Sequence, residues 1–419
     1  MMEHNFSNHG QKYCNIIPFI RLTRLQTLFF YMPFPCHFMV EVKGFEGLRH
    51  PDPATFCTKP YDVISEKEAE ELRKNPDSVI HIILPEENGD KYKKAKAAFE
   101  KFRHRMIKDE PSIYLYEEGN EEFRQRGFIL CVSLQDYEEG RIKKHEETRE
   151  KPLQDRIKHI EATKANTGLV WTIFRKNDDI KAIMDEVMKG QPIVDFQKYG
   201  YRHRLWKISD DTIIQKIKVV FKPLHLYIAD GHHRIAAAWH YWKKHGNGEA
   251  KYVMIFAASD DEVRILPYNR VIRKIERKDF IDELKREFEV EEMESIEEPK
   301  KHEIQMYYKG KWWRLLPKEI PDGIVESLDV SILQNKVLEP ILGIKDVRKD
   351  PNIFFVGGNV SREEYEKLVD EKGNAAVFYL HPTSIEELEA VADANKNMPP
   401  KSTWFDPKLL TGLVFHELE

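Results

Sequence analysis

Short apolar runs alternate with longer amphipathic segments along the chain from about Pro60 onward. Short runs rich in β-branched and aromatic residues are typical of strands, whereas apolar residues that recur every three or four positions are typical of helices. The alternation predicts an α/β protein with mixed α+β layers, not a helical bundle or a β-sandwich. The strands expected in its first part are residues 79–84, 113–116, 127–134, 224–229 and 252–257.

Three expected helix starts carry a serine followed by a glutamate three residues later. This spacing is typical of a capping box, in which each side chain accepts a backbone N–H that the first helical turn leaves free. We interpret these residues as structural. The pairs are Ser65 with Glu68, Ser361 with Glu364, and Ser384 with Glu387.

A change in composition at Ile275 divides the chain. Charged residues crowd the segment that follows, and a second set of strand and helix patterns begins there. We therefore expect an N-terminal α/β domain of residues 39–274 and a smaller C-terminal α/β domain of residues 275–419. The elements expected in the second domain are a strand at 288–293, a hairpin at 304–316 that turns at Lys309-Gly310, a helix at 328–342 and a strand at 353–356.

The first 38 residues do not follow this pattern. Residues 28–38 are apolar and aromatic, but Pro33 and Pro35 interrupt the run, which is too short to span a bilayer. Basic residues precede the run, yet no small-residue cleavage site follows, so it does not match a signal peptide. We expect residues 1–38 to be an artefact of an upstream start, with translation from Met39, and the protein to be cytoplasmic without a membrane segment.

Charge argues against nucleic acid as a partner. Lys and Arg total 66 and Asp and Glu total 71, for a net charge of -5, and the two signs are interleaved along the whole chain. Binding to nucleic acid normally shows as a basic domain, so we expect a small-molecule ligand instead. The sequence does not indicate an oligomeric state.

The strongest chemical signal is the segment LHLYIADGHHRIAAAW, in which an apolar strand runs through a tight turn into an alanine-rich helix. The turn consists of Asp230, Gly231, His232, His233 and Arg234. Unpaired N–H groups and the positive end of the helix dipole favour an anion at such a turn, and Gly231 allows close approach to the backbone. A cation such as Arg234 opposes the dipole in the first helical turn, and a bound phosphate or carboxylate would explain it.

Two other interpretations of this turn compete with the first. In the simpler interpretation, Asp230 caps the helix and the histidines are ordinary polar residues. In the other interpretation, His232 and His233 hold a metal ion. Adjacent histidines on a helix point about 100° apart, however, and neither H-x-x-x-H nor H-E-x-x-H occurs in the sequence. We therefore expect no bound structural metal.

A second polar cluster, HEETRE, directly precedes a helix expected from Pro152. Its density of charge is suited to positioning a substrate amine or a metal–phosphate complex, although charged runs are more often solvated faces. The residues that we select as candidates for catalysis are His145 and Glu146.

The segment MPPKSTWFDPKLLTGLVF holds a third cluster, in which prolines stiffen a loop that presents Lys401, Ser402, Thr403 and Lys408. Rigid loops with converging donors suit anions, whereas the simpler interpretation is a surface tail. A fourth candidate is Asp62, which precedes a capped helix and could act as a general base or as a structural acceptor.

Five phrases containing these clusters occur in the order PYDVIS, HEETREKPLQDR, IADGHHRIAAAW, ILPYNRVI and MPPKSTWFDPKLLTGLVF. In them the chain resembles an uncharacterised family catalogued as domain of unknown function 1015, from about Val40 to residue 419. Five matching phrases in one order are far more specific than a single motif. The family has no established activity. The resemblance therefore implies that the chain is a member of this family, but it does not indicate which reaction the protein catalyses.

The Asp-Gly-His-x-Arg turn is also similar to the nucleotide-phosphate turn of the ParB and sulfiredoxin superfamily, which includes free-serine kinases. The resemblance implies a nucleotide-binding core in which Gly231 and the following N–H groups hold the phosphates of ATP or ADP, and Arg234 neutralises charge. Asp230 or a histidine would orient Mg²⁺ or the hydroxyl nucleophile. Sulfiredoxin has a cysteine where this chain has His232, so its sulfinic-acid repair is not implied, and the kinases' catalytic glutamate has no matched counterpart.

The expected function is therefore a nucleotide-dependent phosphotransferase that acts on a small hydroxyl metabolite, with free L-serine as the example. Two alternatives stay open. One is a ParB-like nucleotide-binding protein that acts on nucleic acid, and the other is a metal-dependent hydrolase built on the two histidines.

Overall fold

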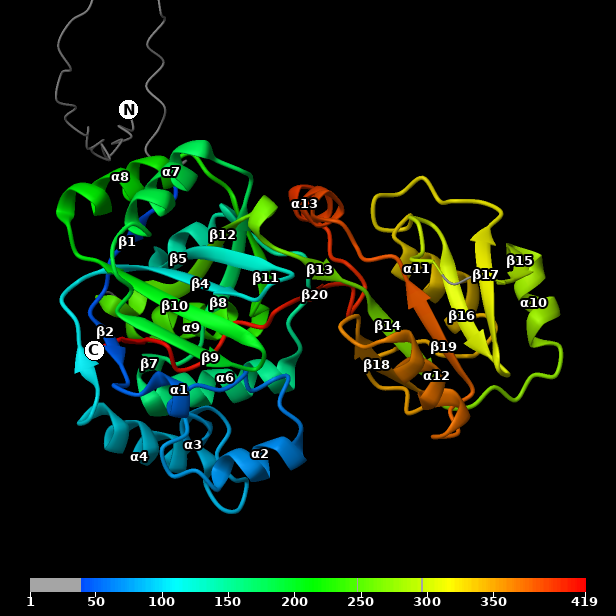
Figure 1. The fold of residues 1–419 in the computed structure, drawn as a ribbon, viewed down its shortest axis with the longest axis horizontal. Coiled ribbons are helices and arrows are strands. Elements are labelled where there is room, and N and C mark those ends of the chain that lie inside the picture. The colour runs from blue at the N-terminus through cyan, green and yellow to red at the C-terminus, as the bar shows by residue number, and fades with distance from the viewer. Residues whose placement is uncertain (1–38, 247, 295–296) are drawn as a thin grey trace, which may run out of the picture. The chain divides into compact units, whose positions relative to one another are not determined.

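The computed structural model describes residues 39–246, 248–294 and 297–419 (Figure 1). Residues 1–38, expected to be an extension, lie outside the described residues. Met39–Glu419 forms one compact unit by its internal contacts. Helices and strands alternate along it, which confirms the mixed α/β class.

The larger sheet has the strand order β6-β11-β8-β12-β5-β4-β10-β9, and β1 pairs with β5 at its side (Figure 1). Parallel pairing joins β6 to β11 and β8 to β12, and the other neighbours are antiparallel. The predictions of strands at 113–116, 127–134, 224–229 and 252–257 are confirmed. The strands are β1 (Val42–Lys43), β4 (Ile113–Gly119), β5 (Arg124–Ser133), β6 (Ile142–Lys143), β8 (Val170–Phe174), β9 (Val194–Lys198), β10 (Tyr201–Ile208), β11 (Leu226–Asp230) and β12 (Tyr252–Ser259).

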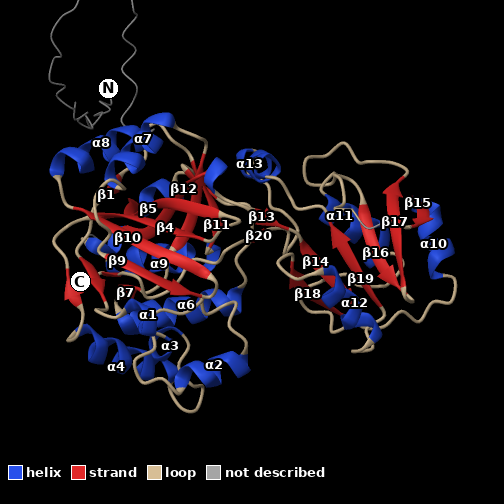
Figure 2. Cartoon of the chain, viewed as in Figure 1, coloured by secondary structure: helices blue, strands red, loops and turns tan. Residues whose placement is uncertain are grey.

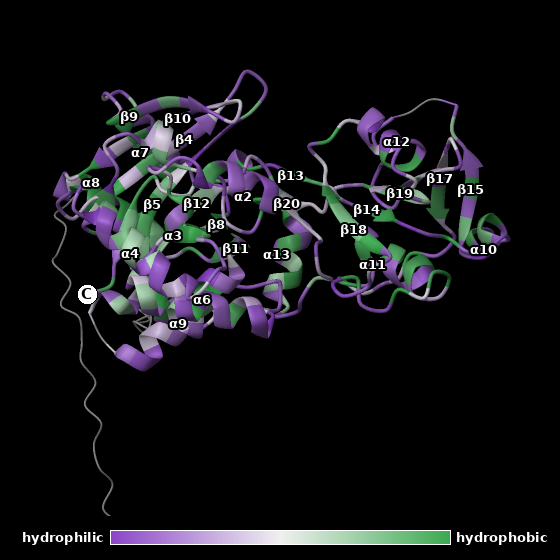
Figure 3. Ribbon diagram, turned by 90° about the horizontal axis from the view of Figure 1, so that it is seen from below, coloured by the Kyte–Doolittle hydropathy of each residue, from purple (hydrophilic) through white to green (hydrophobic). Residues whose placement is uncertain are grey.

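Three amphipathic helices cover one face of this sheet. They are α7 (Asp178–Val187), α8 (Asp211–Phe221) and α9 (His232–His245). Apolar side chains of all three helices pack in one cluster with alternate residues of β4, β5 and β12. Figure 3 shows the hydrophobic colour concentrated in strands such as β5 and β12, as burial between layers requires.

The opposite face of the sheet is covered by the closing part of the chain. Leu409, Leu410, Leu413 and Val414 are buried in a cluster with the residues of β4, β5 and β12 that point away from the helices. β21 (Phe415–Glu417) then joins a small sheet of order β3-β2-β21-β7. The other strands of that sheet are β2 (Gly47–Arg49), β3 (Ile107–Lys108) and β7 (Ala165–Asn166).

A group of helices forms a further apolar cluster under the small sheet. The prediction of a strand at 79–84 is wrong, because this run forms the helix α3. Its apolar residues are buried all round, and such a short run has no period that separates a strand from a helix. The helices of this part are α1 (Pro53–Phe56), α2 (Glu66–Arg73), α3 (Ile80–Ile83) and α4 (Lys91–Arg103). The helix α6 (Glu150–Thr163) packs against both α4 and α9, whereas α5 (Leu134–Glu138) packs against α9 and β5 of the large sheet.

The second sheet is antiparallel, in the order β15-β17-β16-β19-β14-β18 (Figure 2). The hairpin expected at 304–316 and the strand expected at 353–356 are confirmed. β14 lies before the boundary expected at Ile275, yet both its partners belong to this sheet. The strands are β14 (Tyr268–Ile272), β15 (Phe288–Glu292), β16 (Ile304–Tyr308), β17 (Lys311–Pro317), β18 (Ile353–Gly357) and β19 (Ala376–Leu380).

Helices accompany the second sheet, and capping boxes begin two of them. Ser361 with Glu364 and Ser384 with Glu387 are confirmed as reciprocal boxes. The helix expected at 328–342 is shorter and widens into the π-helical turn η4 (Gln334–Leu338). The helices are α10 (Phe280–Glu287), α11 (Asp329–Leu333), α12 (Arg362–Asp370) and α13 (Ile385–Asp393).

Short elements link the two sheets. β13 (Ile265–Leu266) pairs with β20 (Trp404–Phe405), so the strand that precedes β14 is tied to the closing segment of the chain. Two 3₁₀ turns, η2 (Glu249–Lys251) and η3 (Asp260–Glu262), flank β12.

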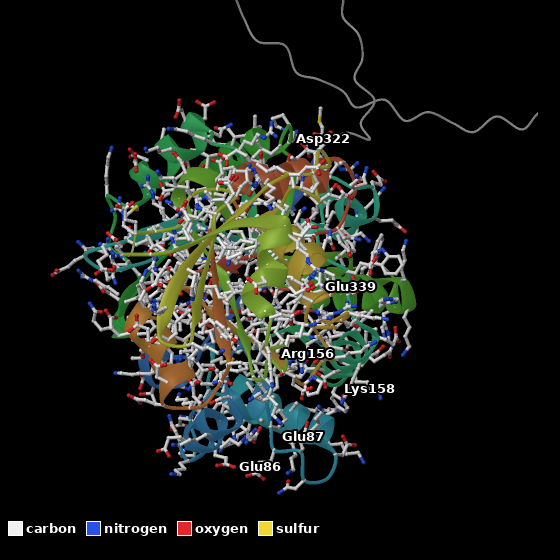
Figure 4. All side chains as sticks on the ribbon, turned by 90° about the vertical axis from the view of Figure 1, so that its right-hand side faces the viewer. Glu86, Glu87, Arg156, Lys158, Asp322 and Glu339 are labelled. Carbon is white, nitrogen blue, oxygen red and sulfur yellow. The ribbon has the colours of Figure 1, made fainter. Side chains whose placement is uncertain are left out.

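Charged side chains lie on the outside of the molecule. Glu86, Glu87, Lys158 and Glu339 are exposed, and Figure 4 shows side chains of both signs around the surface. Among the described residues no helix is both long and apolar enough to cross a membrane.

Candidate functional site

The turn between β11 and α9 has the geometry of an anion-binding helix start. β11 ends at Asp230, Gly231 adopts a left-handed conformation with φ +97°, and α9 begins at His232. No side chain of the described residues caps this helix. The N–H groups of His232 and His233 come before the first intrahelical donor and therefore lie at the positive end of the helix dipole.

The side chain of Arg234 folds back over Gly231. A Cβ atom on Gly231 would lie 3.1 Å from Nε and 3.2 Å from Cζ of Arg234, so only glycine leaves room for the guanidinium here. The guanidinium donates to the carbonyl of Leu169, and its Nη2 lies 3.4 Å from Asp230 and 3.8 Å from Asp62. Arg234 thus has acidic partners in its own chain, which the sequence argument for a bound anion did not include. Its buried Nε finds no acceptor among the described residues.

Asp230 is held between two cations. Lys408 donates a 3.2 Å hydrogen bond to its Oδ2, while Arg234 lies on the Oδ1 side. Burial raises the pKa of Asp230, but the charges of Lys408 and Arg234 outweigh this effect and bring the pKa below its ordinary value. Asp230 is therefore a fixed negative charge.

The histidines His145 and His232 form a buried pair behind the turn. Their rings lie edge to face, 4.6 Å apart, and the N–H of His145 donates to Nε2 of His232 at 3.5 Å. Burial lowers the pKa of His145 to about 4 and that of His232 well below its ordinary value. Both rings are neutral at physiological pH, so we assign them to positioning the turn.

His233 faces the HEETRE segment. Its Nε2 accepts a 2.9 Å hydrogen bond from the backbone N–H of Arg149, which ties the start of α6 to the start of α9. Burial lowers the pKa of His233, and the nearby charge of Arg149 lowers it further.

Two loops from distant parts of the sequence meet beside the turn. The N–H of Met398 donates to the carbonyl of His145 at 2.7 Å, and the Asn397 side chain donates to Glu147 at 3.3 Å. These bonds hold the HEETRE segment against the MPPKST segment.

Lys401 is the cation that these loops present. It adopts a left-handed conformation with φ +61°, and its Nζ lies 5.1 Å from the ring centroid of Tyr268. Burial lowers the pKa of Lys401, but Tyr268 and the carboxylates of Glu146 and Asp62 raise it by more. Lys401 is therefore charged and close to both carboxylates.

Glu146 is half-buried, and its carboxyl lies among opposing charges. Burial raises its pKa; Lys401 opposes this rise, and Asp230 adds to it. A carboxylate with a raised pKa is a stronger base once it is ionised, which suits a role in proton transfer.

The hydroxyl groups of the MPPKST segment differ in their surroundings. Ser402 is buried, and its hydroxyl donates to the carbonyl of Pro399 at 2.6 Å, while its own carbonyl accepts from Thr383. Ser402 thus braces the loop. Thr403 is half-buried beside it.

Several residues beside the turn were not selected from the sequence. Tyr61 has its pKa raised to about 12 by burial and by the charge of Asp62, and the guanidinium of Arg156 lies 3.9 Å from its ring centroid. Both residues line a cavity of about 50 Å³ with Gly168 and Arg234. Tyr61 lies in the phrase PYDVIS and Arg156 in the phrase HEETREKPLQDR. Their place in these two phrases was the signal in the sequence that could have identified them.

Metal-ligating groups do not gather here. Within the described residues, no cluster of three or more His, Cys, Asp or Glu side chains has the arrangement needed to hold a metal ion.

A family model described as a protein of unknown function (DUF1015) matches residues 42–331. No curated protein matches the chain. Several solved structures resemble it at low TM-scores. A free serine kinase variant in complex with ADP is 15% identical with a TM-score of 0.35, and the match covers 68% of this chain and 92% of that one.

Two further solved structures give similar values. SbnI with a C-terminal truncation, from Staphylococcus aureus, is 14% identical with a TM-score of 0.38, covering 68% of this chain and 85% of that one. A conserved hypothetical protein from Pyrococcus furiosus is 16% identical with a TM-score of 0.34, covering 68% and 95%.

Proposed function

The chain belongs to the DUF1015 family of proteins of unknown function, and we propose that it is a nucleotide-dependent phosphotransferase acting on the hydroxyl group of a small metabolite. Free L-serine is the first acceptor to test. One observation carries this proposal: the uncapped start of α9, the cations Arg234 and Lys401, and the carboxylates Asp62 and Glu146 meet at one place.

The start of α9 supplies the phosphate-binding part of the site. The N–H groups of His232 and His233 point outward at the positive end of a fourteen-residue helix, as in other phosphate sites. Lys401 adds a charge that is not held in a short ion pair by any described residue. Together these donors suit the terminal phosphates of a nucleotide.

ATP or ADP with Mg²⁺ would supply the phosphoryl group and part of the charge neutralisation. Asp62 fits the cation, because its carboxylate is partly exposed and oxygen donors are what Mg²⁺ prefers. Asp230 is already bound by Lys408 and Arg234, and its role is to fix those two cations.

Glu146 is the group that we assign to the proton of the acceptor hydroxyl. Its raised pKa makes it a stronger base than an ordinary glutamate, and Lys401 keeps it ionised enough to accept a proton. The hydroxyl oxygen would then attack the terminal phosphorus of the nucleotide as the bond from that phosphorus to its bridging oxygen breaks, so ADP leaves from ATP, or AMP from ADP, while the hydroxyl proton moves to Glu146. The neutral pair His145 and His232 keeps the turn in place.

Binding and transfer test this function separately. We expect ADP or ATP with Mg²⁺ to raise the melting temperature of the protein, and ³¹P NMR to detect a phosphomonoester when L-serine or a related small alcohol is added. Lys401→Gln should weaken nucleotide binding about tenfold, equivalent to about 1.4 kcal/mol. Lys396→Gln, which changes an exposed lysine five positions earlier, is the matched control and should bind as the wild type does.

Two results would count against the proposal. Absence of binding for every adenine nucleotide, with and without Mg²⁺, would remove the phosphate site. Binding that depends on Lys401 but never leads to transfer would leave a nucleotide-binding protein and remove the phosphotransferase.

A further inference from the structure

Arg270 is a buried arginine in the middle of β14. Its residue exposure is 2%, and its guanidinium donates to two backbone carbonyls, those of Tyr268 and of Lys401, the latter at 3.1 Å. Within residues 39–246, 248–294 and 297–419, no carboxylate forms an ion pair with it. The charge is thus met by neutral groups among the described residues: the two carbonyl oxygens and the ring of Phe355, whose centroid lies 5.5 Å from Cζ of Arg270.

A buried charge without a counterion is unfavourable. Burial lowers the pKa of Arg270 to about 9, which shows how poorly its surroundings solvate the cation. The two hydrogen bonds to carbonyl oxygens offset only part of the cost of burying this charge. The strand itself does not require an arginine at this position, so the guanidinium is a candidate anion-binding group.

Arg270 lines a cavity of about 320 Å³ with an excess of positive charge. Lys345 and Arg348 also line it, whereas the one acidic residue of the lining, Asp346, is paired with Arg348 at 3.0 Å. Three cations therefore face one carboxylate that already has a partner. A cavity of this size lies at the small end of ligand pockets, which span about 300–1,000 Å³.

Rigid elements build the walls of this cavity. Gln334 begins the π-helical turn η4, and π-helical turns occur frequently at functional sites. Pro399 and Pro400 also line the cavity. A preformed cavity with stiff walls binds a small ligand with little ordering cost.

The same loop connects this cavity to the phosphate turn. Pro399 and Pro400 line the cavity, and the next residue, Lys401, interacts electrostatically with the carboxylates of Glu146 and Asp62. The carbonyl of Lys401 accepts the hydrogen bond from Arg270. One short segment therefore separates the buried arginine from the proposed site of transfer.

We propose that the Arg270 cavity is a second anion-binding site, which takes the carboxylate of a small hydroxy or amino acid. Resting on the proposed function, this assigns the acceptor class: the carboxylate lies on Arg270, and the hydroxyl is directed past Lys401 toward Glu146. A guanidinium fork suits a carboxylate, because it donates two parallel hydrogen bonds.

Matched pairs of ligands test the carboxylate. Isothermal titration of the full chain would use L-serine, glycolate and malate, each beside its carboxamide, and inorganic phosphate as a separate ligand. We expect at least one carboxylate to bind at least tenfold more tightly than its carboxamide. Arg270→Gln should abolish that difference, and Arg270→Lys should retain part of it.

Control variants separate binding from folding. Arg273→Gln removes an exposed arginine just beyond β14 and should leave carboxylate binding unchanged. If Arg270→Gln does not fold, Lys345→Gln at the exposed rim of the cavity takes its place and should weaken binding about threefold or more. ADP affinity is measured for every variant, and Lys345→Gln, at the rim of the cavity, should keep it.

Each outcome decides the assignment. No carboxylate binding, or binding that Arg270→Gln and Lys345→Gln leave intact, overturns it. Phosphate binding that depends on Arg270, without carboxylate binding, also overturns it and identifies a phosphate site. Carboxylate binding that depends on Arg270 in a protein that binds no nucleotide supports the site while the phosphotransferase proposal fails.

Discussion

Lys408 donates a 3.2 Å hydrogen bond to the carboxylate of Asp230, from a position 178 residues later in the chain. The contact connects the closing segment with the end of β11, directly before the turn that starts α9. It holds in place the carboxylate of Asp230, which also forms an ion pair with Arg234. The candidate site therefore depends on a side chain from the last part of the fold.

We predict that Lys408→Met lowers the free energy of unfolding by about 1–3 kcal/mol at pH 7, because a charged hydrogen bond of low exposure is lost. The pKa of Asp230 lies below its ordinary value, so its contribution is present above about pH 4 and is lost as the pH falls below that. The difference in melting temperature between variant and wild type should therefore be constant from pH 7 to pH 5 and should narrow as the pH falls from 4 to 2. Lys396→Met is the control, and a constant difference from pH 4 to pH 2 would contradict the prediction.

Gly231→Ala should destabilise the protein by about 1–3 kcal/mol, since φ is +97° and the new Cβ would meet Arg234 and Val170. Gly140→Ala is a matched control, because φ there is also positive but nothing lies within 4 Å of the added atom. Chemical denaturation measures both. Equal losses at the two positions would show that the guanidinium moves aside at no cost.

The acid side of the pH–rate profile should identify the general base. The pKa of Glu146 is raised by burial, and a base must be ionised, so kcat/KM should rise with pH through a value above 4.5. Glu146→Gln should remove this rise and lower kcat by about a hundredfold to ten-thousandfold. Asp62→Asn should lower activity but retain the rise, and the reverse pattern would give the role of base to Asp62.

Glu118 allows a test of pH-dependent stability outside the site. It is fully buried, within 3.1 Å of the Tyr116 hydroxyl, which lies 2.7 Å from Nδ1 of His203. Burial raises the pKa of Glu118 to about 8. A raised pKa gives stability that is complete below about pH 4.5 and is lost as the pH rises through 8.

Glu118→Gln cannot ionise, so it should escape this loss. We expect its melting temperature to match the wild type near pH 5 and to exceed it at pH 9, by the equivalent of at least about 1 kcal/mol. Glu121→Gln, at an exposed glutamate, should follow the wild type throughout. Parallel curves for Glu118→Gln and wild type would show that Glu118 is ionised in the folded protein.

Local pattern was sufficient to predict several of the longer strands and the turn at Gly231, but not the strands β8, β9, β10, β14 and β19. The strands at 113–116 and 252–257 are apolar and rich in residues that favour extended backbone, and the Asp-Gly pair marks the end of β11. The helix α3 was missed because its residues are buried on every side, which removes the periodicity on which the prediction depends. Burial of that kind is decided by neighbours far away in the sequence.

The partners of the site residues depend on tertiary packing. Asp62 was selected from its place before a capped helix, but its 3.8 Å approach to Arg234 joins positions far apart in the chain. Arg270 was not selected, because no strand was predicted at residues 268–272 and the arginine stood only within the phrase ILPYNRVI. Its 2% exposure follows from pairing of β14 with both β18 and β19, which no local pattern contains.

The position of β21 has a consequence for the timing of folding during synthesis. β21 inserts between β2 and β7, and the segment before it supplies Lys401 and Lys408. A ribosome must therefore translate residues 398–417 before the phosphate turn, its cations and the small sheet can assemble. Until then the apolar face of the large sheet that residues 409–414 cover is open to water, and exposed apolar surface of this kind makes partly folded chains prone to aggregation.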